Sequence, residues 1–294
     1  MINTSSRRTA LTATGALVAV TALWGVTFVT VKDAIRAIPP YEFLAIRFWI
    51  ATLTLALLFP RIVRPPDRQA RRAILAIGAA LGVGYAFQTV GLKDTSATNA
   101  GFVTGLFVVF TPLVAAVVLR RAPSRIAAAG VLLAAGGLLL LSLGPQWDFR
   151  RGDLLILVTA VAFAFHIVLL GRFSPQHDSR LLATGQLAVS AFGFTAVALL
   201  TERLVVPNSG SLWFALLLTG VGASAAAFLI QTWAQRHLSP TRTAVVLTME
   251  PVFAGIFGYL LLGERLSARG WMGAGMILVS ILLVSLQPAP PSEV

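Results

Sequence analysis

Long apolar runs constrain this chain more than any other feature of its sequence. Ten segments are apolar over about 17–25 residues, the length that crosses a bilayer as an α-helix. With 57% hydrophobic and 12% charged residues, the chain carries about half the charged fraction of a typical soluble protein. The sequence therefore predicts an all-α polytopic membrane protein with ten transmembrane helices, near residues 11–31, 41–59, 73–92, 97–119, 125–143, 153–171, 180–200, 211–234, 241–262 and 268–286.

The formal net charge of +12 does not indicate a nucleic-acid partner. The 23 Lys and Arg residues are spread over short gaps between apolar runs, whereas nucleic-acid binders gather them on one face or tail. The chain contains no cysteine, which excludes disulfides, thiol catalysis and cysteine metal sites. His177 and His237 fall in predicted loops. We therefore expect no metal and no cofactor, and the expected partners are the lipid bilayer and a small-molecule substrate.

The distribution of Lys and Arg predicts how the chain is oriented in the membrane. An inside N-terminus places 14 of them on the cytoplasmic side and 8 on the opposite side, as the positive-inside rule requires. Both termini are then cytoplasmic. The first apolar run continues to about Val31, beyond the h-region of a signal peptide, so we interpret it as an uncleaved span. Residues 287–294 are expected to form a disordered tail.

The two halves of the sequence are similar to each other at a shift of 143 residues. Gln88-Thr89 then falls on Gln231-Thr232, and LLLLSL at 138–143 falls on ILLVSL at 281–286. Each half holds five spans, an odd number, so the second copy must lie inverted in the membrane. Inverted repeats are typical of secondary transporters, whose substrate site lies near the midplane. We predict two five-helix repeats, 11–143 and 153–286.

The pair Glu250-Pro251 is the most informative polar feature within a span. An ionisable residue at membrane depth is costly and is by default a functional-site hypothesis. A proline there frees a backbone carbonyl that only buried protein or a water-lined cavity can satisfy. Two roles stay open for Glu250. It either binds a proton or a cationic substrate group, or it satisfies the backbone that Pro251 opens.

Arg47 and His166 are the other ionisable candidates inside spans. Arg47 either receives a substrate carboxylate or pairs permanently with an interior acid, and the sequence favours the fixed pair. His166 is the only histidine within an apolar run, and a lone histidine of this kind is more often a hydrogen-bonded link between helices than a proton relay. Neither residue belongs to a metal-binding group.

The remaining candidates are uncharged. Trp24 lies in mid-span beside Gly25, where it forms either a pocket wall or ordinary packing. Pro112 and Pro251 are predicted helix breakers, four residues apart in the repeat alignment.

Gly78 and Gly82 form a GxxxG pair, which we interpret first as packing within the chain and only second as a dimer contact. The chain is accordingly expected to be a monomer or a homodimer. Further candidates for the lining of a substrate site are Tyr85, Gln88, Thr104, Gln186, Gln231 and Tyr259.

Several stretches resemble the drug/metabolite transporter superfamily, EamA type. They are LWGVTFVTVK, PYEFLAIRFWIA, NAGFVTGLFVVFTPL and LTMEPVFAGIFGYLLLGERLS, and the resemblance covers roughly residues 11–286. It implies ten helices in two inverted repeats, alternating access around a central cavity, and export of amino-acid-like or drug-like metabolites from the bacterial cytoplasm. Trp24, Arg47, Glu250, Pro251, Glu264 and Arg265 match family positions. The first repeat has Arg120-Arg121-Ala122 where the second has Gly263-Glu264-Arg265, so the acid is missing there.

The sequence thus favours a secondary exporter of the cytoplasmic (inner) membrane, driven by proton exchange, and not an enzyme. No P-loop is present, so ATP is not the direct driver. Uptake through the same fold is one alternative. A membrane enzyme acting on lipid-linked substrates is another, although no paired interfacial carboxylates or nucleophile–base pair is evident. A membrane sensor or scaffold would need an extramembrane module, and the loops are too short for one.

Overall fold

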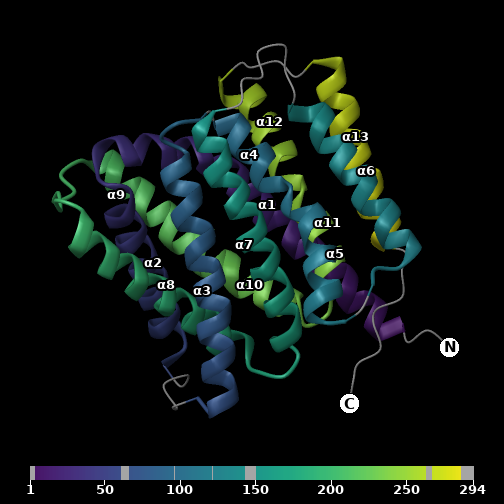
Figure 1. Ribbon diagram of the computed structural model, residues 1–294, viewed down its shortest axis with the longest axis horizontal. Helices are drawn as coiled ribbons and strands as arrows, with labels where there is room; N and C mark the ends of the chain where they lie inside the picture. The colour runs from purple at the N-terminus through teal and green to yellow at the C-terminus, as the bar shows by residue number, and fades with distance from the viewer. Residues whose placement is uncertain are drawn as a thin grey trace.

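The computed structural model describes residues 4–60, 66–95, 97–120, 122–142, 150–262 and 267–285, and every regular element in them is a helix (Figure 1). The first half of the chain contains α1 (Thr4–Ala37), α2 (Pro40–Leu58), α3 (Arg68–Gly91), α4 (Ala97–Gly105), α5 (Phe107–Val118) and α6 (Arg125–Ser142). The second half contains α7 (Arg151–Phe173), α8 (Ser179–Thr201), α9 (Gly210–Leu217), the π-helix η2 (Leu218–Ala226), α10 (Ala227–Ala234), α11 (Pro240–Leu247), α12 (Met249–Leu262) and α13 (Ala268–Ser285). The predicted disordered tail, 287–294, lies outside the described residues, as do Glu264 and Arg265.

Eight helical stretches of the described residues are long and apolar enough to cross a membrane. They include Asn99–Val118, formed by α4 and α5, and Gly210–Ala234, formed by α9, η2 and α10. Large apolar side chains such as Leu57, Val117 and Leu200 are 80, 79 and 83% exposed, which suits a surface that faces lipid. The all-α polytopic membrane fold is confirmed. The apolar part of α6 is shorter and span nine is divided into α11 and α12, so the count of ten spans stays a prediction.

Several acidic side chains outside the bundle centre cap helices. The Asp67 carboxylate accepts a 2.7 Å hydrogen bond from the backbone nitrogen of Ala70 at the start of α3. Glu202, just after α8, accepts from the backbone nitrogens of Tyr41 and Glu42 at 3.1 and 2.9 Å. A carboxylate at a helix N-terminus satisfies orphan N–H groups and interacts favourably with the helix dipole. Glu202 therefore ties the second half of the chain to the start of α2.

The largest helix interfaces join the first half of the chain to the second. Helix α2 packs on α8, α3 packs on α7 and α8, α1 packs on α12, and α6 packs on α13. Figure 1 shows α6 and α13 side by side at one edge of the molecule. The Gly78/Gly82 pair faces α8, where a Cβ on Gly78 would lie 2.6 Å from the Val189 Cβ. This GxxxG pair therefore serves packing within the chain, as the sequence favoured.

Adding a methyl group where α6 meets α13 is expected to lower stability. A Cβ on Gly273 would lie 2.4 Å from the Gly137 carbonyl oxygen and 2.6 Å from the Leu141 nitrogen. Because both obstacles are backbone atoms, Gly273→Ala must push the helices apart, at a cost of about 1–3 kcal/mol. Thermal unfolding in detergent measures the effect. Gly275→Ala on the same helix, which meets nothing within 4 Å, is the control, and equal melting temperatures for the two variants would contradict the prediction.

Two spans are interrupted at nearly the same position of the repeat alignment. The breaks lie at Leu106, between α4 and α5, and at Thr248, between α11 and α12. At the shift of 143 residues Leu106 falls on Met249, so the breaks are one residue apart. At each break a backbone nitrogen bonds to the carbonyl three residues before it, at 3.2 Å.

The two prolines stand differently relative to these breaks. Pro251 follows its break closely and removes the donor that the Leu247 carbonyl would use. Pro112, in contrast, lies inside α5, which continues through it. The predicted four-residue offset between the prolines is therefore not the offset between the breaks.

Candidate functional site

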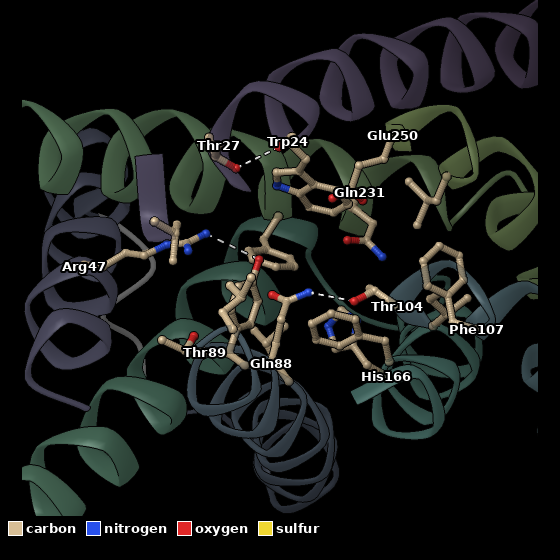
Figure 2. Close-up of a pocket in the computed structure, with 18 residues that line it drawn as sticks. Trp24, Thr27, Arg47, Gln88, Thr89, Thr104, Phe107, His166, Gln231 and Glu250 are labelled. Carbon is tan, nitrogen blue, oxygen red and sulfur yellow. Dashed lines mark hydrogen bonds between the residues drawn. The ribbon is translucent and has the colours of Figure 1, made fainter. Parts of the chain in front are cut away.

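A cavity lies between the two halves of the chain. Helices α1, α2, α3, α4, α5, α7, α10, α11 and α12 contribute to its wall. Figure 2 shows the lining side chains converging from these helices. Eight of the ten lining residues predicted from the sequence contribute to it: Trp24, Arg47, Tyr85, Gln88, Thr104, His166, Gln231 and Glu250.

Two predicted residues are placed differently. Gln186 is fully buried and lies behind the lining, where it contacts His166 and Thr232. Tyr259 belongs to α12, but its side chain lies outside the described part of the structure.

The threonine hydroxyls on either side of Trp24 bond within α1. Thr21 and Thr27 donate to the carbonyls of Val18 and Trp24, at 2.7 and 2.8 Å.

Trp24 forms part of the wall because α1 approaches α12 closely beside it. A Cβ on Gly25 would lie 2.9 Å from both the Ala254 nitrogen and the Glu250 carbonyl oxygen, so only glycine allows this approach. The Trp24 indole nitrogen donates a 2.8 Å hydrogen bond to the carbonyl of Ala223 on η2. Its ring also lies 5.6 Å from that of Phe228. The pocket-wall hypothesis for Trp24 is therefore the one that the geometry supports.

Arg47 is buried at the cavity without an acidic partner among the described residues. Its Nε donates to the Ser224 hydroxyl at 2.9 Å, and its Nη2 lies 3.4 Å from the Tyr85 hydroxyl. Its guanidinium carbon lies 4.8 Å from the centre of the Tyr85 ring, a cation–π arrangement. The fixed ion pair that the sequence favoured is thus not formed in the described structure. Neutral groups hold the guanidinium in the part of the chain that the structure describes.

Glu250 occupies the first turn of α12, immediately after the break at Thr248. A carboxylate there interacts favourably with the helix dipole. No hydrogen bond or ion pair joins its carboxyl group to another described residue, and none therefore reaches the Leu247 carbonyl that Pro251 leaves free. In Figure 2, Glu250 and Arg47 lie on opposite sides of the cavity. The cavity therefore holds one acidic and one basic side chain that do not bond to each other in the described structure.

Gln231 presents an acceptor without a partner. The Gln235 amide nitrogen donates to the Ile167 carbonyl at 2.7 Å, and a carbonyl can only accept. The Gln235 oxygen must therefore face Gln231, whose amide nitrogen donates to it at 3.1 Å. This leaves Gln231 Oε1 buried without a hydrogen bond among the described residues. Such an acceptor is costly unless a ligand supplies a donor.

His166 lines the cavity and connects it to two side chains behind it, Gln186 and Thr232. The Thr232 hydroxyl donates to the Phe228 carbonyl at 2.6 Å, so it can only accept from Gln186 Nε2, at 3.2 Å. Gln186 Oε1 then faces His166 Nε2 at 2.6 Å, and this ring nitrogen carries the proton. The bridge connects α7, α8 and α10. It agrees with the structural role that the sequence favoured for His166.

The sequence did not single out the aromatic residues of the lining, namely Phe107, Phe163 and Phe228. The Tyr85 ring packs against two of them, with ring centroids 5.3 Å from Phe163 and 6.1 Å from Phe228. Within an apolar run, phenylalanine carries no signal that separates a cavity wall from packing. Ser224 and Gln235 were also missed. Both are polar residues inside an apolar span, and that property alone could have marked them.

Comparisons with known proteins agree on one family. The model of the EamA-like transporter family matches residues 12–143 and 150–286. An uncharacterized transporter from Archaeoglobus fulgidus is 33% identical over 92% of this chain and 85% of its own length. The uncharacterized inner membrane transporter YedA of Escherichia coli is 26% identical over 92% of this chain and 90% of its own. A protein of known crystal structure shares the fold, with a TM-score of 0.77, 20% identity, and coverage of 94% of this chain and 97% of that one.

Proposed function

The chain belongs to the EamA-like transporter family, and we propose that it is a secondary transporter that exports small zwitterionic metabolites of the amino-acid kind across the bacterial cytoplasmic membrane. It is a multi-pass membrane protein, and its relatives are named as transporters. These names support a carrier without enzymatic activity. The inner-membrane location named for YedA supports the proposed membrane.

One observation carries the choice of solute: Arg47 and Glu250 line the same cavity, and neither pairs with an oppositely charged group among the described residues. A buried charge without a counter-charge is unfavourable. A monovalent cation would be attracted by Glu250 and repelled by Arg47. A simple anion would be attracted by Arg47 and repelled by Glu250. A zwitterion supplies both partners at once. Its ammonium group has three N–H donors, enough for Glu250 and for the unpartnered Gln231 Oε1.

Alternating access between the two halves is the proposed mechanism. The packing of α2 on α8 and of α3 on α7 supports it, because the cavity then lies where the halves meet. The breaks at Leu106 and Thr248 lie next to lining residues of that cavity and supply local hinges. We propose the repeats 11–143 and 153–286 as the moving bodies and proton exchange as the driving reaction, with Glu250 as the group that binds the proton or the solute cation.

Counterflow into proteoliposomes tests the solute class. Vesicles loaded with unlabelled L-amino acids are diluted into a panel of the labelled compounds, with choline and succinate as a cation and a dianion. We expect an L-amino acid to accumulate above protein-free vesicles, and choline and succinate to stay at background. Accumulation of choline or succinate alone would overturn the zwitterion. Accumulation of an L-amino acid only by uptake into intact cells, never by efflux, would reverse the proposed direction.

Both termini are proposed to be cytoplasmic, and the cysteine-free chain allows a direct test. Arg68 at the start of α3 and Lys93 just after its end are both exposed. In intact cells, Lys93→Cys is expected to react with a membrane-impermeant maleimide, whereas Arg68→Cys reacts only after the membrane is opened. The parent chain is the unlabelled control, since it contains no cysteine. The opposite labelling pattern would invert the topology.

A further inference from the structure

The π-helix η2 lies in the middle of a membrane span and contacts two cavity-lining side chains. It covers Leu218–Ala226, nine residues within the apolar stretch Gly210–Ala234. π-Helical turns are rare, and they occur disproportionately at functional sites. Two consecutive residues of η2, Ala223 and Ser224, accept the hydrogen bonds of Trp24 and Arg47. The π-helical segment therefore supplies the hydrogen-bond acceptors that hold two side chains of the cavity wall, Trp24 and Arg47.

The backbone register of η2 changes beside the attachment of Trp24. In an α-helix the Ala223 carbonyl would accept from the backbone nitrogen of Ala227, four residues later. Here the Ala227 nitrogen bonds instead to the carbonyls of Gly222 and Ser224. The Ala223 carbonyl accepts the Trp24 indole N–H at 2.8 Å. The segment with the unusual register thus also holds a side chain from the first half of the chain.

The same segment, η2, contacts both the backbone and the side chain of Arg47. A Cβ on Gly220 would lie 3.1 Å from the Arg47 carbonyl oxygen and 2.7 Å from the Ile50 side chain, so this glycine brings η2 against the backbone of α2. Four residues later, the fully buried Ser224 hydroxyl accepts from Arg47 Nε at 2.9 Å. The bond uses the inner nitrogen of the guanidinium. Nη1 therefore remains for a ligand, and no described residue bonds to it.

We propose that Ser224 is a positioning residue for Arg47, which holds the guanidinium fork in the orientation that receives the carboxylate of the solute. The proposal rests on the proposed function for the identity of the solute, although the bond between Ser224 and Arg47 does not. Without the serine hydroxyl, Nε has no acceptor, and the side chain must rotate to find one. The guanidinium then points away from the position where two of its N–H groups meet a carboxylate side by side.

The test compares Ser224→Ala with Thr219→Val. Thr219 is also fully buried in η2, but its hydroxyl bonds to the Ala215 carbonyl of its own helix at 2.7 Å. The probes are the L-amino acid that exchanges fastest in counterflow and its decarboxylated amine. For Ser224→Ala we expect the KM of the amino acid to rise about tenfold, with the maximal rate and the binding of the amine little changed. Thr219→Val leaves all of these values unchanged. Equal losses for the amino acid and the amine would overturn the proposal.

A second measurement needs no solute and separates this proposal from the proposed function. Arg47→Lys keeps the positive charge but removes the Nε donor. Ser224→Ala is expected to lower the melting temperature of the parent protein and to have little further effect in the Arg47→Lys background. Equal shifts in both backgrounds would mean that the hydroxyl acts independently of Arg47, and would overturn the proposal even if amino acids are transported. If instead Ser224→Ala lowers the melting temperature only when Arg47 is present, and no amino acid exchanges, the role of Ser224 is supported and the proposed solute is wrong.

Discussion

Glu250→Gln is expected to abolish proton-driven transport of the amino-acid probe and to slow its counterflow about 10- to 100-fold. Glutamine has nearly the same shape but can neither carry the proton nor pair with an ammonium group. A hydrogen bond to a charged group contributes about 1.5–3 kcal/mol, which corresponds to this factor. The measurement is uptake of labelled probe into proteoliposomes, once with an imposed pH gradient and once with unlabelled probe inside.

The two assays also separate the two roles of the acid. If Glu250 carries only the proton, proton-driven uptake is lost but counterflow, which needs no net proton movement, survives. If Glu250 contacts the solute, both fall. Asp33→Asn is the matched control, because Asp33 is an exposed acid whose partner is Arg36, at 2.9 Å on the surface. Wild-type rates for Glu250→Gln in both assays would remove Glu250 from the mechanism.

Arg47→Gln is expected to raise the KM of the amino-acid probe by about 10- to 100-fold and to leave the binding of the decarboxylated amine unchanged or improved. Glutamine removes the counter-charge of the carboxylate, and it also removes the repulsion that the guanidinium exerts on an amine. Counterflow at increasing concentrations of the labelled amino acid measures its KM, and inhibition of this counterflow by the amine measures the binding of the amine.

A second arginine with an aromatic partner provides the control for Arg47. The Arg180 guanidinium carbon lies 5.0 Å from the centre of the Phe59 ring, and Arg180 does not line the cavity. Arg180→Gln is therefore expected to leave the KM of the amino acid and the binding of the amine at the parent level. A parallel loss of both probes in Arg47→Gln, with a lowered melting temperature, would instead assign Arg47 a purely structural role.

Much of the fold could be predicted because a bilayer leaves few structures open to an apolar chain. Helices satisfy their own backbone hydrogen bonds within the membrane, so the length of each apolar run predicted a helix. Polar residues inside such runs are few, and they face the protein interior rather than lipid. That rule is sufficient to explain why Glu250, Arg47, Gln88 and Gln231 line one cavity.

The partners of these residues could not be predicted, because they depend on packing between distant helices. Arg47 was expected to meet an acid, yet its nearest acceptor is the hydroxyl of Ser224 in the other half of the chain. Gln186 looked equivalent to the lining residues but lies one layer behind them, since His166 stands between it and the cavity. The π register of η2 has no signature in LTGVGASAA beyond its small residues.

The positions of the helix breaks illustrate the same limit. Proline is the strongest breaker in the sequence, and Pro251 does follow the break at Thr248. Span four breaks at Leu106 instead, directly after Gly105, while α5 accommodates Pro112. A Cβ on Gly105 would lie 2.7 Å from the Leu138 side chain, so the fit of α4 against α6, and not proline chemistry alone, accompanies this break.

The hydrogen-bonded series from the Ile167 carbonyl through Gln235 to Gln231 has a consequence for how this cavity can evolve. Its direction is set by a main-chain oxygen, which every residue type at position 167 would supply. Substitution at position 167 changes the size of that side chain, but the Gln231 amide nitrogen still faces Gln235 and the Gln231 oxygen is still left without a donor. The preference for a hydrogen-bond donor at this end is therefore inherited with the backbone. It is lost only if one of the two glutamines is replaced.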